Sequence, residues 1–145
     1  MNQTIAIGSD HAGFALKESL VETLTQLGYA PLDLGTNGPD SVDYPDFAHA
    51  MAGALGAGKA DKGVLICGSG IGISMAANRH PDVRAALVHD ALGARMCRQH
   101  NDANVIVFGG RMIGIEVARD CLEIFLKTEF EGGRHQRRID KITPA

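Results

Sequence analysis

Short apolar runs alternate with segments of helical periodicity along the whole chain, and this alternation restricts the fold more than any other feature. Five apolar runs predict strands, at 4–8, 29–34, 63–67, 84–88 and 104–108. The spacing of apolar residues predicts a helix after each of them, over 14–27, 45–55, 71–78, 91–99 and 113–126. Parallel strands need such helical crossovers, which cover both faces of a sheet. We therefore predict a Rossmann-like, doubly wound α/β fold in which a five-stranded parallel sheet is the middle of three layers.

The length of the chain fits one domain. With 145 residues, it can bury about two-thirds of the surface of its unfolded state in one core. The sequence contains no internal repeat, linker or low-complexity segment that would mark a second domain. It therefore predicts a single domain over residues 1–145.

Charge and composition argue against two classes of partner. The chain has 14 Lys and Arg against 17 Asp and Glu, so it gives no reason to expect binding to nucleic acid or to an anionic membrane. The sequence does not open on a basic region followed by a long apolar segment, and we expect neither a signal peptide nor a membrane span. The three cysteines are odd in number and widely spaced. This fits a cytoplasmic protein better than a disulfide framework or a structural metal site.

The segment Cys67–Gly72 stands where a predicted strand ends and a predicted helix begins. Its alternate glycines allow a tight turn and leave backbone N–H groups exposed, so the loop can form an anion-binding concavity. Such a setting also favours the thiolate, the reactive form of cysteine. From the residues alone, Cys67 is either a base or nucleophile beside an oxyanion-binding loop, or a buried cysteine whose neighbouring glycines serve close packing.

Two nucleotide-binding motifs resemble this loop only in part. A P-loop would end in Gly-Lys-Ser or Gly-Lys-Thr, which is absent here. The dinucleotide fingerprint would require Gly or Ala where Ile73 stands, although Asp90 provides an acidic residue at about the right distance along the chain. Nucleotide binding is thus disfavoured but remains an alternative.

Polar residues follow four of the predicted strands. In open parallel sheets, the ligand site lies beyond the carboxyl ends of the strands, so these segments should meet at one edge. They are Ser9–His11, Cys67–Gly72, His89–Asp90 and Gly109–Arg111. Taken singly, Asp10 could cap a helix and His89 could be an exposed loop residue. Together, the four segments predict a polar site.

Two further groups carry chemistry outside these strand ends. His100 ends the fourth predicted helix, a position that suits a proton shuttle or simply complements the helix dipole. Arg134 and Arg138 are four residues apart, so on a helix they would share one face. They could clamp a phosphate or form a solvated surface.

Five motifs in combination are similar to those of a known family. They are Gly8–Phe14, Asp43–Pro45, Cys67–Ser74, Arg98–Asp102 and Glu131–Gln136. With these motifs, the chain resembles the type B ribose-5-phosphate isomerases, a family that also contains the subunits of galactose-6-phosphate isomerase. The resemblance covers nearly all of the sequence.

The resemblance implies a cytoplasmic enzyme of the non-oxidative pentose phosphate pathway. It implies interconversion of ribose 5-phosphate and ribulose 5-phosphate through an enediolate, without metal or organic cofactor. Cys67 is implied as the base that moves the proton between C2 and C1, His100 as the residue that assists ring opening, and Ser69 as a catalytic hydroxyl. Some members use a Glu of the following helix as the base instead, but residues 74–76 are Ser-Met-Ala here.

The resemblance also implies a binding site for the sugar phosphate. The residues implied are Asp10, His11, Tyr44, Gly68, Gly70, Ile71, Gly72, Asn101, Arg111, Arg134 and Arg138. Family members form homodimers, sometimes tetramers, with sites shared between chains. By this resemblance, His100 and Arg111 would reach the Cys67 site of the partner chain.

Two alternatives to ribose 5-phosphate isomerisation stay open on the sequence. The first is an isomerase of a six-carbon sugar phosphate, such as allose 6-phosphate or galactose 6-phosphate. The second is a non-catalytic nucleotide-binding module on a similar sheet.

Overall fold

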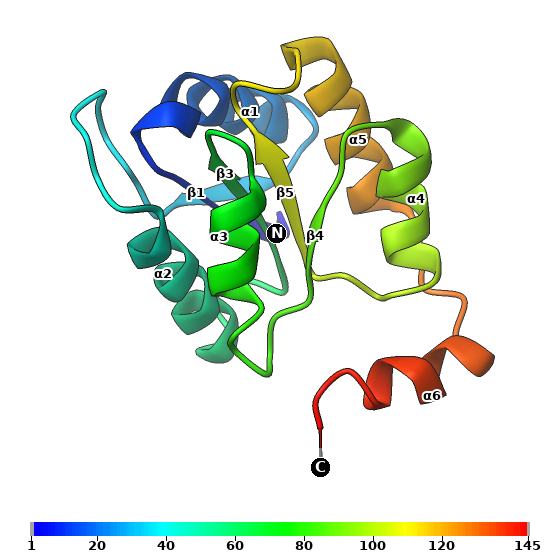
Figure 1. Cartoon of the computed structure of the whole chain (residues 1–145). Coiled ribbons are helices and arrows are strands. Elements are labelled where there is room, and N and C mark those ends of the chain that lie inside the picture. The colour runs from blue at the N-terminus through cyan, green and yellow to red at the C-terminus, as the bar shows by residue number, and fades with distance from the viewer. Residues whose placement is uncertain (1, 145) are drawn as a thin grey trace.

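The computed structural model describes residues 2–144. Five strands form one sheet (Figure 1): β1 (Thr4–Ser9), β2 (Ala30–Asp33), β3 (Lys62–Cys67), β4 (Ala85–Leu87) and β5 (Val105–Gly109). Their order is β2-β1-β3-β5-β4, and every neighbouring pair is parallel. Each strand boundary lies within one residue of the predicted run. The predicted fold class is confirmed.

Helices cover both faces of this sheet (Figure 1). One face carries α1 (Phe14–Gln26), α4 (Ala91–Gln99) and α5 (Ile115–Lys127), which contact one another through α5. The other face carries α2 (Tyr44–Gly56) and α3 (Ile71–Ala77). A short 3₁₀ helix, η1 (His11–Gly13), precedes α1, and α6 (Arg134–Asp140) follows α5. Among residues 2–144, none of the helices combines the length and the apolar character needed to cross a membrane.

Alternating strand residues fill the two core layers. Ile5 and Ile7 of β1 face the helices α1, α4 and α5, whereas Ala6 between them belongs to the layer under α2 and α3. This is the period of two that a strand imposes on its side chains. Strands β3 and β5 are buried on both faces, which explains why their sequences are continuously apolar rather than alternating.

The connections change face between β1 and β3. The chain leaves β1 into α1 on one face and leaves β3 into α3 on the other, although β1 and β3 are neighbours in the sheet. Such a switch point opens a crevice beyond the carboxyl ends of the two strands. Asp10 follows β1 and Cys67 ends β3, so these two residues stand at the switch point.

Helix α6 lies at the opposite end of the sheet (Figure 1). Helix α4 begins just beyond the carboxyl end of β4 and has nine residues, so it carries the chain about 13 Å back toward the amino ends of the strands. There it ends at His100, next to the segment that leads into α6. The basic C-terminal segment is therefore far from the Cys67 loop of the same chain.

Candidate active site

Cys67 is the last residue of β3 and is only 4% exposed. The chain turns from β3 into α3 through Gly70, which has a φ of 79°. A Cβ at this position would lie 2.5 Å from Leu87 Cδ1 and 3.0 Å from the carbonyl carbon of Phe108. Both the left-handed backbone and the lack of space thus require glycine at residue 70. The hydroxyl of Ser69 accepts a hydrogen bond from the Ile71 amide (3.2 Å), which closes the turn.

This turn gives a stability prediction. Gly70→Ala should lower the free energy of unfolding by about 1 to 3 kcal/mol, because the alanine is both strained and overpacked. Gly53→Ala is the matched control, since Gly53 lies inside α2 with open space around its Cβ position. That change should raise stability by about 0.5 to 1 kcal/mol. Thermal and denaturant unfolding measure both values, and the prediction is wrong if the two variants shift in the same direction.

Asp10 stands at the end of β1 and is 5% exposed. Its Oδ1 accepts hydrogen bonds from the amides of Ala12 (3.0 Å) and Gly13 (3.1 Å), so it caps η1. The backbone amide of Asp10 donates to the carbonyl of Ile66 (3.2 Å), which fixes the residue beside the end of β3. The capping interpretation is therefore correct, and both bonds use the same oxygen, Oδ1.

Arg111 follows β5 and lies over the Cys67 loop. Its amide donates to the carbonyl of Gly68 (3.0 Å), and the neighbouring amide of Gly110 donates to the carbonyl of Cys67 (2.8 Å). A Cβ at Gly68 would lie 3.2 Å from Arg111 Nη1, so the guanidinium rests directly on this glycine. The resemblance assigns Arg111 to the site of a partner chain. Within one chain, Arg111 lies beside the Cys67 loop.

His11 and Tyr44 complete this edge. Nδ1 of His11 accepts a hydrogen bond from the amide of Val42 (3.1 Å) and so ties the segment before α2 to the end of β1. The ring of Tyr44 covers Gly72, where a Cβ would lie 2.5 Å from Tyr44 Cζ. We use the name rim cluster for the residues that the structure brings together here: Asp10, His11, Tyr44, Cys67, Gly68, Ser69, Gly70, Ile71, Gly72 and Arg111.

The predicted polar segment after β4 has a structural explanation. Asp90 is the N-cap of α4, and its Oδ1 accepts a hydrogen bond from the amide of Gly93 (2.7 Å). His89 is exposed beside it. Since a cap accounts for the carboxylate of Asp90, this residue gives no support to a nucleotide ribose site.

The other predicted site residues lie apart from the rim cluster. His100, Asn101 and Arg138 line a cavity of about 320 Å³ together with His135, Ile139 and Ile142. We call this cavity the α6 pocket. Arg134 is exposed at the first residue of α6. Within one chain, the structure therefore does not bring His100, Asn101, Arg134 or Arg138 to Cys67.

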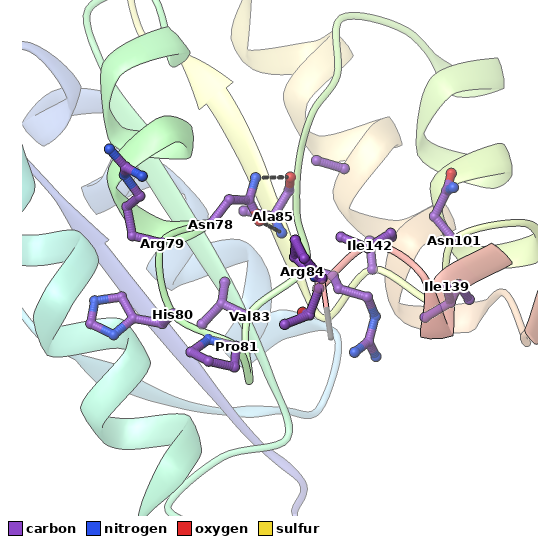
Figure 2. A pocket seen from close by; sticks show the side chains of 14 residues that line it. Asn78, Arg79, His80, Pro81, Val83, Arg84, Ala85, Asn101, Ile139 and Ile142 are labelled. Atoms are coloured by element: carbon purple, nitrogen blue, oxygen red, sulfur yellow. Dashed lines mark hydrogen bonds between the residues drawn. The ribbon is translucent and has the colours of Figure 1, made fainter. Parts of the chain in front are cut away.

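A larger cavity of about 620 Å³ adjoins the α6 pocket (Figure 2). It lies between the segment that follows α3 and the C-terminal segment, and Asn101, Ile139 and Ile142 line both cavities. On its far wall, the side chain of Asn78 exchanges two hydrogen bonds with the backbone of Ala85 (2.8 and 2.9 Å). Because no rim-cluster residue lines this cavity, we do not assign the chemistry of Cys67 to it.

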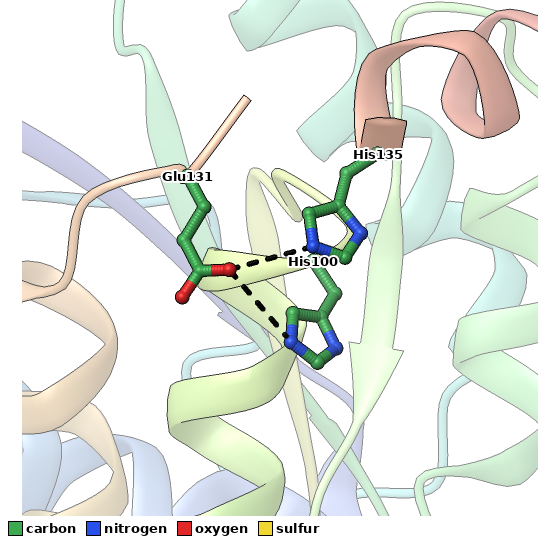
Figure 3. A group of neighbouring side chains, drawn as sticks. All are labelled: His100, Glu131 and His135. Carbon is green, nitrogen blue, oxygen red and sulfur yellow. Dashed lines mark ion pairs between the residues drawn. The ribbon is translucent and has the colours of Figure 1, made fainter. Parts of the chain in front are cut away.

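Sequence reasoning missed Glu131 and His135. Both belong to one of the five motifs, but their contact does not follow from helical spacing, because Glu131 precedes α6 and the chain turns between them through Gly132 and Gly133, both of positive φ. Figure 3 shows both beside His100. Glu131 Oε1 lies 3.4 Å from His135 Nε2 and 4.0 Å from His100 Nε2, and the two imidazoles stack with centroids 4.4 Å apart and planes inclined by 14°.

The three ligand atoms lie within 4.8 Å of one another, close enough to suggest a metal site. The ring geometry does not fit one. A metal ion must lie near the plane of each imidazole that binds it, at about 2.1 Å from the nitrogen. Two nearly parallel rings stacked 4.4 Å apart share no such point unless one of them turns. The cluster fits a network of polar and stacking contacts better.

Comparisons with known proteins agree with this architecture. Residues 5–142 match the family model described as Ribose/Galactose Isomerase. Ribose-5-phosphate isomerase B of Escherichia coli is 44% identical over 139 residues, which cover 96% of this chain and 93% of that protein. The chain also superimposes on the solved structure of Clostridium thermocellum ribose-5-phosphate isomerase B. That match has a TM-score of 0.95 and 48% identity, and it covers 97% of this chain and 95% of the other.

A second solved structure leads to the same assignment. The ribose 5-phosphate isomerase of Thermotoga maritima matches with a TM-score of 0.95 and 47% identity, over 98% of each chain. Identity of this level over the full fold, together with the family model, leaves one assignment: this chain belongs to the ribose/galactose isomerase family.

Proposed function

We propose that this chain is an aldose–ketose isomerase that interconverts ribose 5-phosphate and ribulose 5-phosphate. The observation that carries the proposal is the rim cluster, in which a cysteine, a carboxylate and a guanidinium meet at the switch point of the sheet. The similarity to proteins named ribose-5-phosphate isomerase B in Escherichia coli and Clostridium thermocellum supports the same reaction.

Cys67 is the base of the proposed proton transfer. Its thiolate removes the proton from C2 of the open-chain aldose, the electrons move to the carbonyl oxygen, and an enediolate forms. The thiol then returns the proton to C1 while the hydroxyl proton on O2 passes to O1, which gives the ketose with its C2 carbonyl and C1 hydroxyl. Backbone N–H groups of the loop 68–72 other than that of Ile71, with the Ser69 hydroxyl, stabilise the oxyanion, and each well-placed donor is worth about 3 to 4 kcal/mol.

The remaining rim residues bind and orient the sugar. The free oxygen of Asp10 accepts hydrogen bonds from sugar hydroxyls, and Tyr44 closes the site over Gly72. Arg111 and His11 hold the phosphate, a task that suits a planar guanidinium with several donors. Arg134 and Arg138 add further positive charge to the phosphate site from α6 of a second chain.

Two chains build each proposed site. Ring opening by His100 and proton transfer by Cys67 act on one sugar, yet one chain holds the two residues at opposite ends of its sheet. A homodimer that sets the α6 pocket of one chain against the rim cluster of the other resolves this separation. Exposed apolar pairs on α3 and α4, namely Ile71 with Met75 and Leu92 with Met96, support such an interface.

The proposal also covers the domain organisation of the chain and its cellular compartment. Residues 1–145 act as one sugar-phosphate isomerase domain, consistent with a family match over 5–142. All three cysteines are free and buried, which suits the reducing cytoplasm. A six-carbon sugar phosphate is the second candidate substrate, because the matched family is described by both ribose and galactose.

A direct assay tests the proposal. The purified protein should convert ribose 5-phosphate to ribulose 5-phosphate without added metal, whereas ribose without its phosphate should react far more slowly. Allose 6-phosphate and galactose 6-phosphate, measured in parallel by kcat/KM, decide between five-carbon and six-carbon substrates. A protein that binds nucleotide and leaves every sugar phosphate unchanged would instead be a binding module, and the proposal would fail.

A further inference from the structure

The end of α4 is fixed firmly to the segment that leads into α6. The buried guanidinium of Arg98 donates to the carbonyl of Thr128 through Nε (3.1 Å) and to Asp102 Oδ1 through Nη1 (2.8 Å). The backbone amide of Glu131 donates to the carbonyl of Gln99 (3.1 Å). These bonds hold Glu131 next to His100 even though 30 residues separate them in the sequence.

His135 is the unusual member of this cluster. It is 6% exposed, and within residues 2–144 its buried Nε2 has no hydrogen-bond partner. A buried polar atom without a partner is costly and calls for an explanation. The contacts of the ring supply this explanation. The His135 ring stacks on the half-buried His100 ring, and its Nε2 faces the Glu131 carboxylate at 3.4 Å.

Both neighbours restrict the imidazole of His100. The stacked ring of His135 fixes the plane of His100, which would otherwise rotate at the surface. The carboxylate of Glu131 faces Nε2 of His100 and so favours a proton on that nitrogen. Nδ1 is then the nitrogen that remains free to exchange a proton with a sugar.

We propose that Glu131 and His135 are positioning residues for ring opening, holding His100 so that its Nδ1 acts on the furanose. This inference rests on the proposed function. In the ring-opening step, the bond between C1 and the ring oxygen breaks and a C1 carbonyl forms. The anomeric hydroxyl gives its proton to Nδ1 of His100, and Nδ1 passes that proton on to the ring oxygen. Neither Glu131 nor His135 touches the reacting atoms.

The test separates ring opening from proton transfer at carbon. Isomerisation of ribose 5-phosphate requires ring opening. Exchange of the C1 hydrogens of ribulose 5-phosphate with deuterated water does not, because this ketose is an open chain whose enediolate forms at Cys67. Glu131→Gln and His135→Ala should lower kcat for ribose 5-phosphate about 10- to 100-fold, as expected for a misplaced reacting group. Deuterium exchange, followed by NMR, should stay within about threefold of wild type.

Two further variants control for folding. His135→Phe keeps a flat ring that can stack on His100, and it removes no hydrogen bond, because Nε2 of His135 makes none within residues 2–144. This variant should therefore fold normally and keep most of the activity that His135→Ala loses. Glu129→Gln removes an exposed carboxylate two residues from Glu131 and should change nothing. Thermal unfolding is measured for every variant.

The outcomes are distinct. Equal losses in isomerisation and in exchange would show that the two residues only support the fold, and losses below threefold in both would show that His100 needs neither neighbour. Either result overturns the inference. A wild-type protein that fails to isomerise ribose 5-phosphate would instead overturn the proposed function.

Discussion

Cys67→Ala is expected to lower kcat for ribose 5-phosphate by at least about 100-fold, the smallest effect of removing a general base from such a reaction. Cys67 is the only cysteine at the end of a strand beside the glycine loop. Substrate binding should persist, because Asp10 and Arg111 remain in place. Steady-state kinetics and isothermal titration calorimetry measure the two quantities separately.

Cys97 and Cys121 are the matched controls. They lie inside α4 and α5, as predicted from the sequence, and burial raises the pKa of each thiol to about 11. Both groups therefore stay protonated near neutral pH and cannot serve as bases there. Cys97→Ala and Cys121→Ala should keep kcat within about threefold of wild type, although each loses some packing. If Cys67→Ala kept more than a tenth of the activity, Cys67 would not be the base.

Most of the fold could be predicted because it depends on local periodicity. The helix at 91–99 was predicted with its observed ends from the helical spacing of its apolar residues, and Asp90 is its N-cap. The strand order was not predicted, because it depends on pairings between residues far apart. The sheet edge that holds the rim cluster could nevertheless be predicted without the strand order, because the carboxyl ends of all parallel strands lie at the same edge.

The site was harder to predict where tertiary contacts determine which side chains meet. Tyr44 reaches Gly72 because α2 packs beside α3, and no spacing in the sequence encodes that contact. The stack of His100 on His135 likewise depends on hydrogen bonds that tie residues 128 and 131 to the end of α4. The sequence indicated which residues carry chemistry, but the geometry divides them between the rim cluster and the α6 pocket.

This division leads to a second large effect, the recovery of activity in mixed dimers. Cys67→Ala and His100→Asn should each be nearly inactive alone. If each site takes its rim cluster from one chain and its α6 pocket from the other, a dimer of one chain of each kind has one intact site. Random exchange of equal amounts should then restore about a quarter of the wild-type activity per chain.

A second mixture serves as the control and locates Arg111. Since Arg111 lies on Gly68 of its own chain, Cys67→Ala and Arg111→Ala damage the same rim cluster. Each site of their mixed dimer then has a defective rim, and mixing should restore nothing. Recovery in this pair would show that Arg111 acts in the partner's site, as the family resemblance suggests. If exchange is demonstrated by mass spectrometry and neither pair recovers, each site is built from one chain, and His100 must reach Cys67 by a rearrangement within it.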